Sequence, residues 1–127
     1  MSNPFIRDFD ELVINLKNDI ESKESSLYIA KDDENSMIKE LLVQNLEREI
    51  NGKKISFIAI RNIVLNEEFK GKGYFSKFLI ELENLKVNVM FHDVINSRLM
   101  IYLKSKNYHE YKEKKYEEEV ISLYKVF

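Results

Sequence analysis

Residues 55–75 contain the feature that most restricts how this chain can fold. A nearly continuous apolar, β-branched run over residues 54–65 is followed by the polar turn Glu67-Glu68-Phe69-Lys70-Gly71-Lys72-Gly73, which holds two of the chain's three glycines. The run predicts a central strand buried on both faces, and the apolar periodicity of residues 74–85 predicts a helix. A strand, a glycine turn and a helix in this order place free backbone N–H groups and a helix N-terminus where a phosphate can bind.

The composition excludes several kinds of site before any motif is considered. The chain has 127 residues, of which 44% are hydrophobic and 12% aromatic, enough for one domain with a real core. Its 20 basic and 22 acidic residues nearly cancel, which does not favour a general nucleic-acid binder. There is no cysteine, and two scattered histidines, His92 and His109, predict no metal site. No apolar run approaches the roughly 20 residues of a membrane span and no signal-peptide pattern is present, so we expect a cytoplasmic protein without a membrane partner.

Hydrophobic spacing predicts most of the remaining elements. Three- and four-residue spacing predicts an amphipathic helix over residues 4–21, and Asn96 or Ser97 can cap a third helix. Further strands are predicted at residues 27–30, 87–94, 106–111 and 120–127. The mixed charges of residues 112–119 indicate a solvated turn or hairpin tip. This order implies an α/β or α+β domain with a mixed sheet whose last two strands are antiparallel. An edge strand at residues 120–127 could pair with a second copy, so a monomer and a homodimer both stay open.

Residues 36–50 fit two different structures. Their apolar side chains fall on one helical stripe, and Gly52 would end such a helix. Yet Asn51-Gly52 is also a strong two-residue hairpin turn, which would join a strand over residues 43–50 to the strand that follows. We favour the helix, which makes residues 1–52 a mainly helical N-terminal part, and a helix that gives way to a strand in its last turns also stays open.

The glycine turn resembles the cofactor-binding motif of the GNAT superfamily, the acyl-CoA-dependent N-acetyltransferases. In that family an aliphatic strand end leads to Arg/Gln-x-x-Gly-x-Gly/Ala and a helix. Here Ile63-Val64-Leu65 ends the strand, and Lys70-Gly71-Lys72-Gly73-Tyr74-Phe75 fills the loop. Lys70 replaces the usual Arg or Gln. Phe75 takes the place of a small residue, where its bulk could crowd a pyrophosphate or turn the helix. Taken alone, the same turn could be a plain surface turn with two lysines.

A second segment matches the same family at the expected distance. Residues 96–108 resemble Asn-x-x-Ala-x-x-x-Tyr-x-x-x-Gly-Phe, with Asn96 in place and Asn107-Tyr108 standing for Gly-Phe. Asn tolerates the left-handed backbone that Gly would supply. The family's tyrosine falls on Leu103, with Tyr102 one residue earlier. The likeness covers residues 54–127, and it implies a mixed, mostly antiparallel sheet flanked by helices, with a reduced N-terminal half.

The resemblance implies acetyl-CoA as co-substrate and an amine, either a small molecule or a protein, as acceptor. It makes residues 53–127 a CoA-binding core. The cofactor site implied in this way consists of Val64, Leu65, Lys70, Gly71, Lys72, Gly73, Tyr74, Phe75, Ser76 and Asn96. Val64 and Leu65 would pair with pantetheine, and the amides of residues 71–76 would hold the pyrophosphate. The neighbouring parallel strands would separate and admit the thioester, which the amine attacks directly. No metal is implied.

The base for this reaction is not obvious in the sequence. Proton transfer needs a base for the amine and an acid for the departing thiolate. The strand over residues 55–65 carries no acidic residue, and Glu67 and Glu68 are expected to be solvated. His92 is the better candidate because its pKa suits proton transfer near neutrality, and the alternative is a partly buried structural histidine. Asp93 would point to the opposite face in a regular strand.

The residue that would protonate the departing thiolate is not obvious in the sequence either. Tyr102 is the candidate if the helix register shifts by one residue, and otherwise it is a core aromatic. The strand has no carboxylate, and Leu103 stands at the family's tyrosine position. A non-catalytic CoA-binding, regulatory or interaction module on the same fold is therefore the alternative to an N-acetyltransferase.

Overall fold

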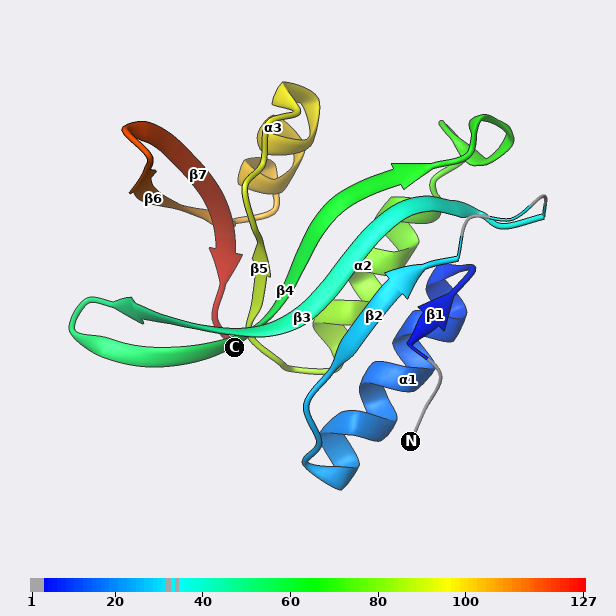
Figure 1. The fold of residues 1–127 in the computed structure, drawn as a ribbon, viewed down its shortest axis with the longest axis horizontal. Helices are drawn as coiled ribbons and strands as arrows, with labels where there is room; N and C mark the ends of the chain where they lie inside the picture. Colours follow the sequence, from blue (N-terminus) through cyan, green and yellow to red (C-terminus); the bar gives the residue numbers. More distant parts are fainter. Residues whose placement is uncertain (1–3, 32, 34) are drawn as a thin grey trace.

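The computed structural model describes residues 4–31, 33 and 35–127. The strands are β1 (Phe5–Ile6), β2 (Leu27–Ala30), β3 (Ile38–Ile50), β4 (Lys53–Leu65), β5 (Val89–Phe91), β6 (His109–Lys115) and β7 (Glu118–Lys125). The helices are α1 (Phe9–Ser22), the short 3-10 helix η1 (Glu67–Phe69), α2 (Tyr74–Asn84) and α3 (Ser97–Ser105). The strands form one sheet in the order β1–β2–β3–β4–β5–β7–β6 (Figure 1). The β1–β2 and β4–β5 pairs are parallel and the other pairs antiparallel, so the expected mixed, mostly antiparallel sheet is confirmed.

β3 and β4 form one long hairpin. Their pairing runs from Ile50 opposite Lys53 to Ile38 opposite Leu65. Asn51 and Gly52 form the turn, with φ of 51° and 82°, and positive φ at both central residues is what the tight hairpin turns favoured by Asn-Gly require. The predicted helix over residues 36–50, and with it the mainly helical character of residues 1–52, is therefore wrong, and the hairpin alternative is confirmed.

α1 is shorter than the helix predicted over residues 4–21. Asp8 has an extended backbone, and its carboxylate accepts a hydrogen bond from the N–H of Glu11 at 2.8 Å. This cap fixes the start of the helix at Phe9. The preceding Phe5–Ile6 instead forms β1, which pairs in parallel with β2, the strand predicted at residues 27–30.

The C-terminal elements agree with the predictions in type and differ in extent. α2 and the Asn96-capped α3 are confirmed, and β5 is shorter than the strand predicted at residues 87–94. Most of residues 112–119 is strand, because β6 and β7 meet in a tight turn at Tyr116 and Glu117, whose φ values are 52° and 66°. β6 and β7 are antiparallel as expected. β7 lies between β5 and β6, so it is not the edge strand predicted, and the described sheet has its edges at β1 and β6.

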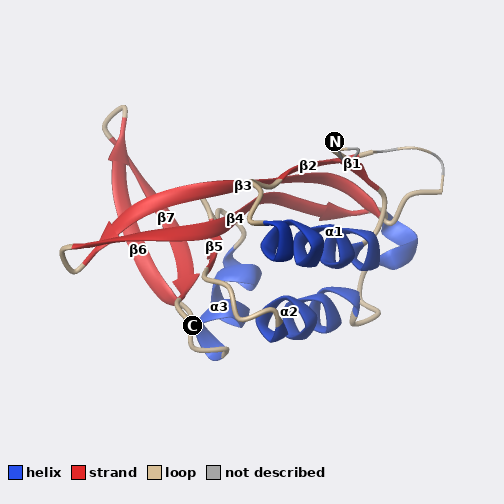
Figure 2. Cartoon of the chain, turned by 90° about the horizontal axis from the view of Figure 1, so that it is seen from below, coloured by secondary structure: helices blue, strands red, loops and turns tan. Residues whose placement is uncertain are grey.

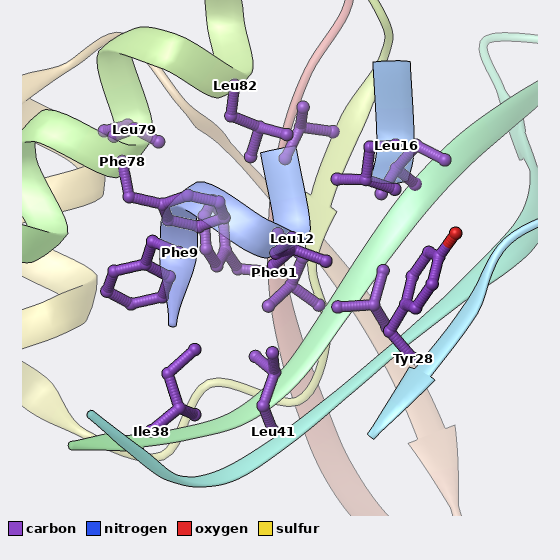
Figure 3. Packing of buried hydrophobic residues seen from close by; sticks show 14 of the residues in the cluster. Phe9, Leu12, Leu16, Tyr28, Ile38, Leu41, Phe78, Leu79, Leu82 and Phe91 are labelled. Carbon is purple, nitrogen blue, oxygen red and sulfur yellow. The ribbon is translucent and has the colours of Figure 1, made fainter. Parts of the chain in front are cut away.

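The main core lies between the sheet and helices α1 and α2, which run side by side on one of its faces (Figure 2). The rings of Phe9 and Phe78 stack with centroids 4.3 Å apart (Figure 3). Leu12, Leu16 and Leu82 are fully buried around them. Burial of these side chains is the main source of stability for the pairing of the two helices with the sheet.

Replacement of one of the two stacked rings should lower the stability of the protein much more than a matched replacement of an exposed residue on the same helix. Phe78 is 1% exposed, whereas Ile80 is 62% exposed. We expect Phe78→Ala to lower the free energy of unfolding by about 3–5 kcal/mol, and Ile80→Ala to change it by less than about 1 kcal/mol. Urea denaturation followed by circular dichroism measures both, and similar losses in the two variants would show that this core is misplaced.

Candidate functional site

β4 and β5 lie side by side for a short distance and then separate. Their pairing runs from Ile58 opposite Val89 to Ile60 opposite Phe91. The N–H of His92 then donates to the carbonyl of Ile60 at 2.9 Å. Beyond this bond β4 bends away from the chain that continues β5 (Figure 1). The separation leaves the facing edges of the two segments open to a ligand.

An extra residue in β4 accounts for the bend. Leu42 pairs with Arg61 and Glu40 with Val64, so three steps along β4 match two steps along β3. Asn62, within this stretch, has a φ of 56°, a left-handed conformation that Asn adopts more readily than most residues. Such a bulge bends its strand and increases its twist, and it therefore turns the end of β4 away from β5.

A pocket of about 460 Å³ occupies the space between the separated strands, and we term it the strand gap. Its walls are β4 around the bulge, residues 91–96, Leu99 of α3 and Glu40 of β3. Most of the lining side chains are apolar, with a few polar groups among them that include His92 and Asn96. The size and the mixture of groups are those of a small-molecule site.

The glycine loop, residues 70–76, presents a row of free backbone donors at the end of the same strand. Gly71 and Gly73 have φ of 71° and 80°, and a Cβ added to either would meet no atom within 4 Å. Gly73 caps α2 without any side-chain hydrogen bond. Within the described part of the chain, none of the N–H groups of residues 71–76 donates a hydrogen bond. Six unpaired amides at a positive helix end form an anion-binding arrangement.

The charged side chains of the loop point to solvent. Lys70 Nζ lies 2.9 Å from Glu67 Oε1, and this hydrogen bond and charge lower the pKa of Glu67 below its ordinary value. Lys72 is exposed and forms no ion pair with any described residue. Glu67 and Glu68 are exposed, as expected. Lys72 is therefore the cation that the loop can offer to an anion without breaking an existing pair.

Phe75 packs inward, so its bulk does not occupy the open side of the loop. Its ring lies between 5.9 and 6.4 Å, centroid to centroid, from those of Phe9, Phe78, Phe91 and Tyr102. The helix starts directly at Tyr74. The crowding and the turned helix considered for Phe75 are both absent from this structure. The contact with Phe91, which also lines the strand gap, places the start of α2 next to that gap.

Two site residues predicted from separate motifs meet at this point. The hydroxyl of Tyr102 donates to Ser76 Oγ at 3.0 Å. Leu103, at the family's tyrosine position, is fully buried, so Tyr102 supplies the hydroxyl that α3 presents to the start of α2. Asn96 lines the strand gap, and its side chain caps α3 by accepting from the N–H groups of Arg98 and Leu99.

The other predicted cofactor residues lie where β4 leads into the loop. Val64 lines the strand gap, and Leu65 is the last residue of β4. Tyr74 packs edge-on against Phe69 of η1 with ring centroids 5.8 Å apart. This contact joins the end of η1 to the start of α2 and so limits how far the glycine loop can move.

His92 lies between the strand gap and a second cavity. Its side chain is 8% exposed and lines both. Nε2 is 3.7 Å from Glu113 Oε1, and the buried Nδ1 has no hydrogen-bond partner in the part of the chain that the structure describes. Burial lowers the pKa of His92 below the ordinary 6.5, the charge of Arg61 lowers it further, and the Glu113 carboxylate opposes the change. The ring is therefore neutral near pH 7 and able to accept a proton.

The structure adds polar residues that the sequence interpretation did not identify as site residues. These are Glu40, Arg48, Arg61, Asp93 and Glu113. Glu40 and Arg48 were missed because residues 36–50 were expected to form a helix. Glu113 was missed because residues 112–119 were expected to form a turn. Asp93 was expected to face away from His92 in a regular strand, but β5 ends at Phe91 and Asp93 has a φ of 55°. Its carboxylate pairs with Arg61, and Asp93 and His92 both line the strand gap.

Comparisons with protein-family models, with curated proteins and with solved structures gave no match for this chain. Among residues 4–31, 33 and 35–127, no cluster of His, Asp or Glu side chains is arranged to hold a metal ion. The helices in the same residues lack the length and apolar character needed to cross a bilayer.

The lowered pKa of His92 should make stability depend on pH. Since the folded pKa lies below the unfolded value of about 6.5, the unfolded chain binds a proton first as the pH falls. The free energy of unfolding therefore decreases below about pH 7 until the folded protein is protonated as well. We expect His92→Gln to remove this component and the exposed-site control His109→Gln to retain it. Urea denaturation across this pH range measures the effect, and parallel curves for wild type and His92→Gln would refute it.

Proposed function

We propose that this chain binds an acyl-CoA, with acetyl-CoA the simplest case, and transfers the acyl group to an amine on a GNAT-like fold. One observation carries the proposal: the strand gap and the six free amides of the glycine loop lie at the same end of β4. A pyrophosphate fits the amides because they offer several N–H donors at a helix N-terminus. An extended pantetheine arm fits the unpaired edge of β4, since its amide groups can pair with strand backbone.

The parallel pairing of β4 with β5 and its early end support the same proposal. They match the arrangement that the likeness over residues 54–127 implies, in which neighbouring parallel strands separate and admit the thioester. Val64 and Leu65 would bind pantetheine, residues 71–76 the pyrophosphate, and Lys72 would add a positive charge beside it. Asn96 would contact the cofactor from the far wall of the gap.

His92 is the group best placed to take a proton from the amine. It is neutral near pH 7, it lines the strand gap, and its Nδ1 is free of any described partner. The hydroxyl of Tyr102 donates to Ser76 in the first turn of α2, and from there it would return a proton to the leaving thiolate. The chemistry is direct attack of the amine nitrogen on the thioester carbonyl, with orientation in the gap supplying much of the rate.

A CoA-binding module without turnover is the second candidate. The absence of a carboxylate over residues 55–65 and the position of Leu103 in the core both favour it. Two carboxylate residues, Glu40 of β3 and Asp93, line the strand gap, and Asp93 is paired with Arg61. Binding without any acyl transfer would select this candidate.

Binding of acetyl-CoA can be tested with two matched glycine variants. We expect wild type to bind with a Kd below about 1 mM, and Gly73→Glu to weaken binding by about 100-fold or more because a carboxylate would meet the pyrophosphate. Gly52→Glu is the control, since Gly52 has nearly the same φ and equally open surroundings but lies in the β3–β4 turn. Isothermal calorimetry measures all three. Failure of wild type to bind at millimolar acetyl-CoA, or equal losses in both variants, would contradict the assignment.

Turnover separates the two candidate functions. Wild type and His92→Gln would be assayed for thiol release from acetyl-CoA over a panel of amines. If His92 is the base, its replacement by Gln should lower kcat by about 10²- to 10⁴-fold with the affinity for acetyl-CoA unchanged. Equal kcat in the two proteins would remove His92 from the mechanism, and no release with any amine would favour the binding module.

A further inference from the structure

A second cavity, of about 140 Å³, shares His92 with the strand gap and is lined mainly by cations. We term it the cationic cavity. Its lining residues are Arg48 of β3, Arg61 of β4, His92, Val120 of β7, and Glu113, Lys114 and Lys115 of β6. The β6–β7 hairpin thus closes over the face of the sheet opposite α1 and α2, and its charges face those of β3 and β4.

The two arginines are held in place by carboxylates. Arg48 Nε lies 3.1 Å from Glu113 Oε2, and Arg61 Nη2 lies 3.2 Å from Asp93 Oδ2. The four side chains are only 26–33% exposed, so solvent screens their charges less than it screens a surface pair. The guanidinium groups are therefore oriented before any ligand arrives.

The arginines keep donors that no described residue uses. The Nε and Nη1 groups of Arg61, and Nη2 of Arg48, have no partner in the described chain. Lys114 and Lys115 are exposed and form no ion pair there, and Glu113 is the one carboxylate in the lining. The cavity therefore has a surplus of positive charge and planar donors that suit a carboxylate or a phosphate.

His92 provides an independent sign of a ligand. More than nine-tenths of its side chain is buried, and Nδ1 is left without a hydrogen bond within the described residues. A buried polar atom in this state is costly unless a partner occupies the site. An N–H group of a ligand would satisfy it, and His92 is the residue that both cavities share.

We propose that the acceptor is an amine that also carries an acidic group, a carboxylate or a phosphate, which Arg61 and Arg48 hold in the cationic cavity. The amine then lies at His92, facing the strand gap. The acyl-transfer step rests on the proposed function, whereas the anion site does not. The neutral amine nitrogen forms the new amide bond, the carbon–sulfur bond breaks, the surplus proton of the nitrogen passes to His92, and the thiolate takes a proton from Tyr102.

The volume of the cavity favours a short acceptor. A space of about 140 Å³ takes an acidic group and a few carbon atoms. An acceptor without an acidic group would bring a positive amine into a site with surplus positive charge, which opposes binding. The acid group of the acceptor removes this repulsion and pairs with the free donors of Arg61.

NMR of the His92 ring tests the anion site directly. The chain has two histidines, so comparison with His92→Gln assigns the signals. The probes are glycine, β-alanine and 4-aminobutyrate, the carboxamide of each, and inorganic phosphate. We expect at least one acid to shift the His92 signals in a saturable way, with its carboxamide at least about tenfold weaker. Phosphate binding with no response to the amino acids would assign the acid group as a phosphate.

Two arginine variants locate the site. Arg61→Gln should lose the response, and Arg7→Gln should keep it, because Arg7 pairs with Asp33 away from both cavities. Arg61→Lys, which keeps the charge, covers the case in which Arg61→Gln fails to fold. Equal responses to an acid and its carboxamide, or no response to any anion up to about 50 mM, would overturn the proposal.

Calorimetry with acetyl-CoA on the same samples separates this proposal from the proposed function. A protein that binds the acids at His92 but not acetyl-CoA would keep the anion site and lose the acyl-transfer role. A protein that binds acetyl-CoA but shows no anion response would keep the cofactor site and lose the acidic acceptor.

Discussion

The parallel pairing of β4 with β5 ends at Ile60 and Phe91 because β4 carries an extra residue near Asn62. A regular β4 would continue to pair with the chain after β5 and leave no room between them. With the bulge, one side of the opening is β4, which leads on to the glycine loop, and the other is the segment that carries His92 and Asn96. One local irregularity thus positions the pocket, its polar groups and the approach to the start of α2.

The parts of the fold that depend on local signals could be predicted from the sequence. The apolar run of β4, the periodicity of α2 and the side chain of Asn96 each determine structure within a few residues. Asn107, which stands in place of the Gly of the motif, was expected to tolerate a left-handed backbone, and its φ is 69°. The glycine loop is predictable for the same reason, since its positive φ values and its place between a strand and a helix are local properties.

The parts that depend on partners distant in sequence could not be predicted. In β3 the fully buried side chains fall on Ile38, Leu41 and Val43, whereas the half-buried ones near the turn fall on Leu46 and Ile50. The change between Ile38 and Leu41 falls where the register with β4 shifts, whereas the change between Val43 and Leu46 lies in regular pairing, where the more buried face of the strand changes. The combined set therefore has the spacing of a helix. The cationic cavity could not be predicted from the sequence for the same reason, because Arg48 and Glu113 come together only when β6 folds over the β3–β4 hairpin.

Hydrogen–deuterium exchange with and without acetyl-CoA tests most directly whether the end of β4 and the glycine loop form one ligand site. We expect the ligand to slow exchange in residues 62–65 and 70–76, where free backbone groups meet the bound molecule, and to leave residues 51–52 at the far end of the β3–β4 hairpin unchanged. Exchange that acetyl-CoA leaves unaltered in both segments, or slows only elsewhere, would contradict the assignment of this site.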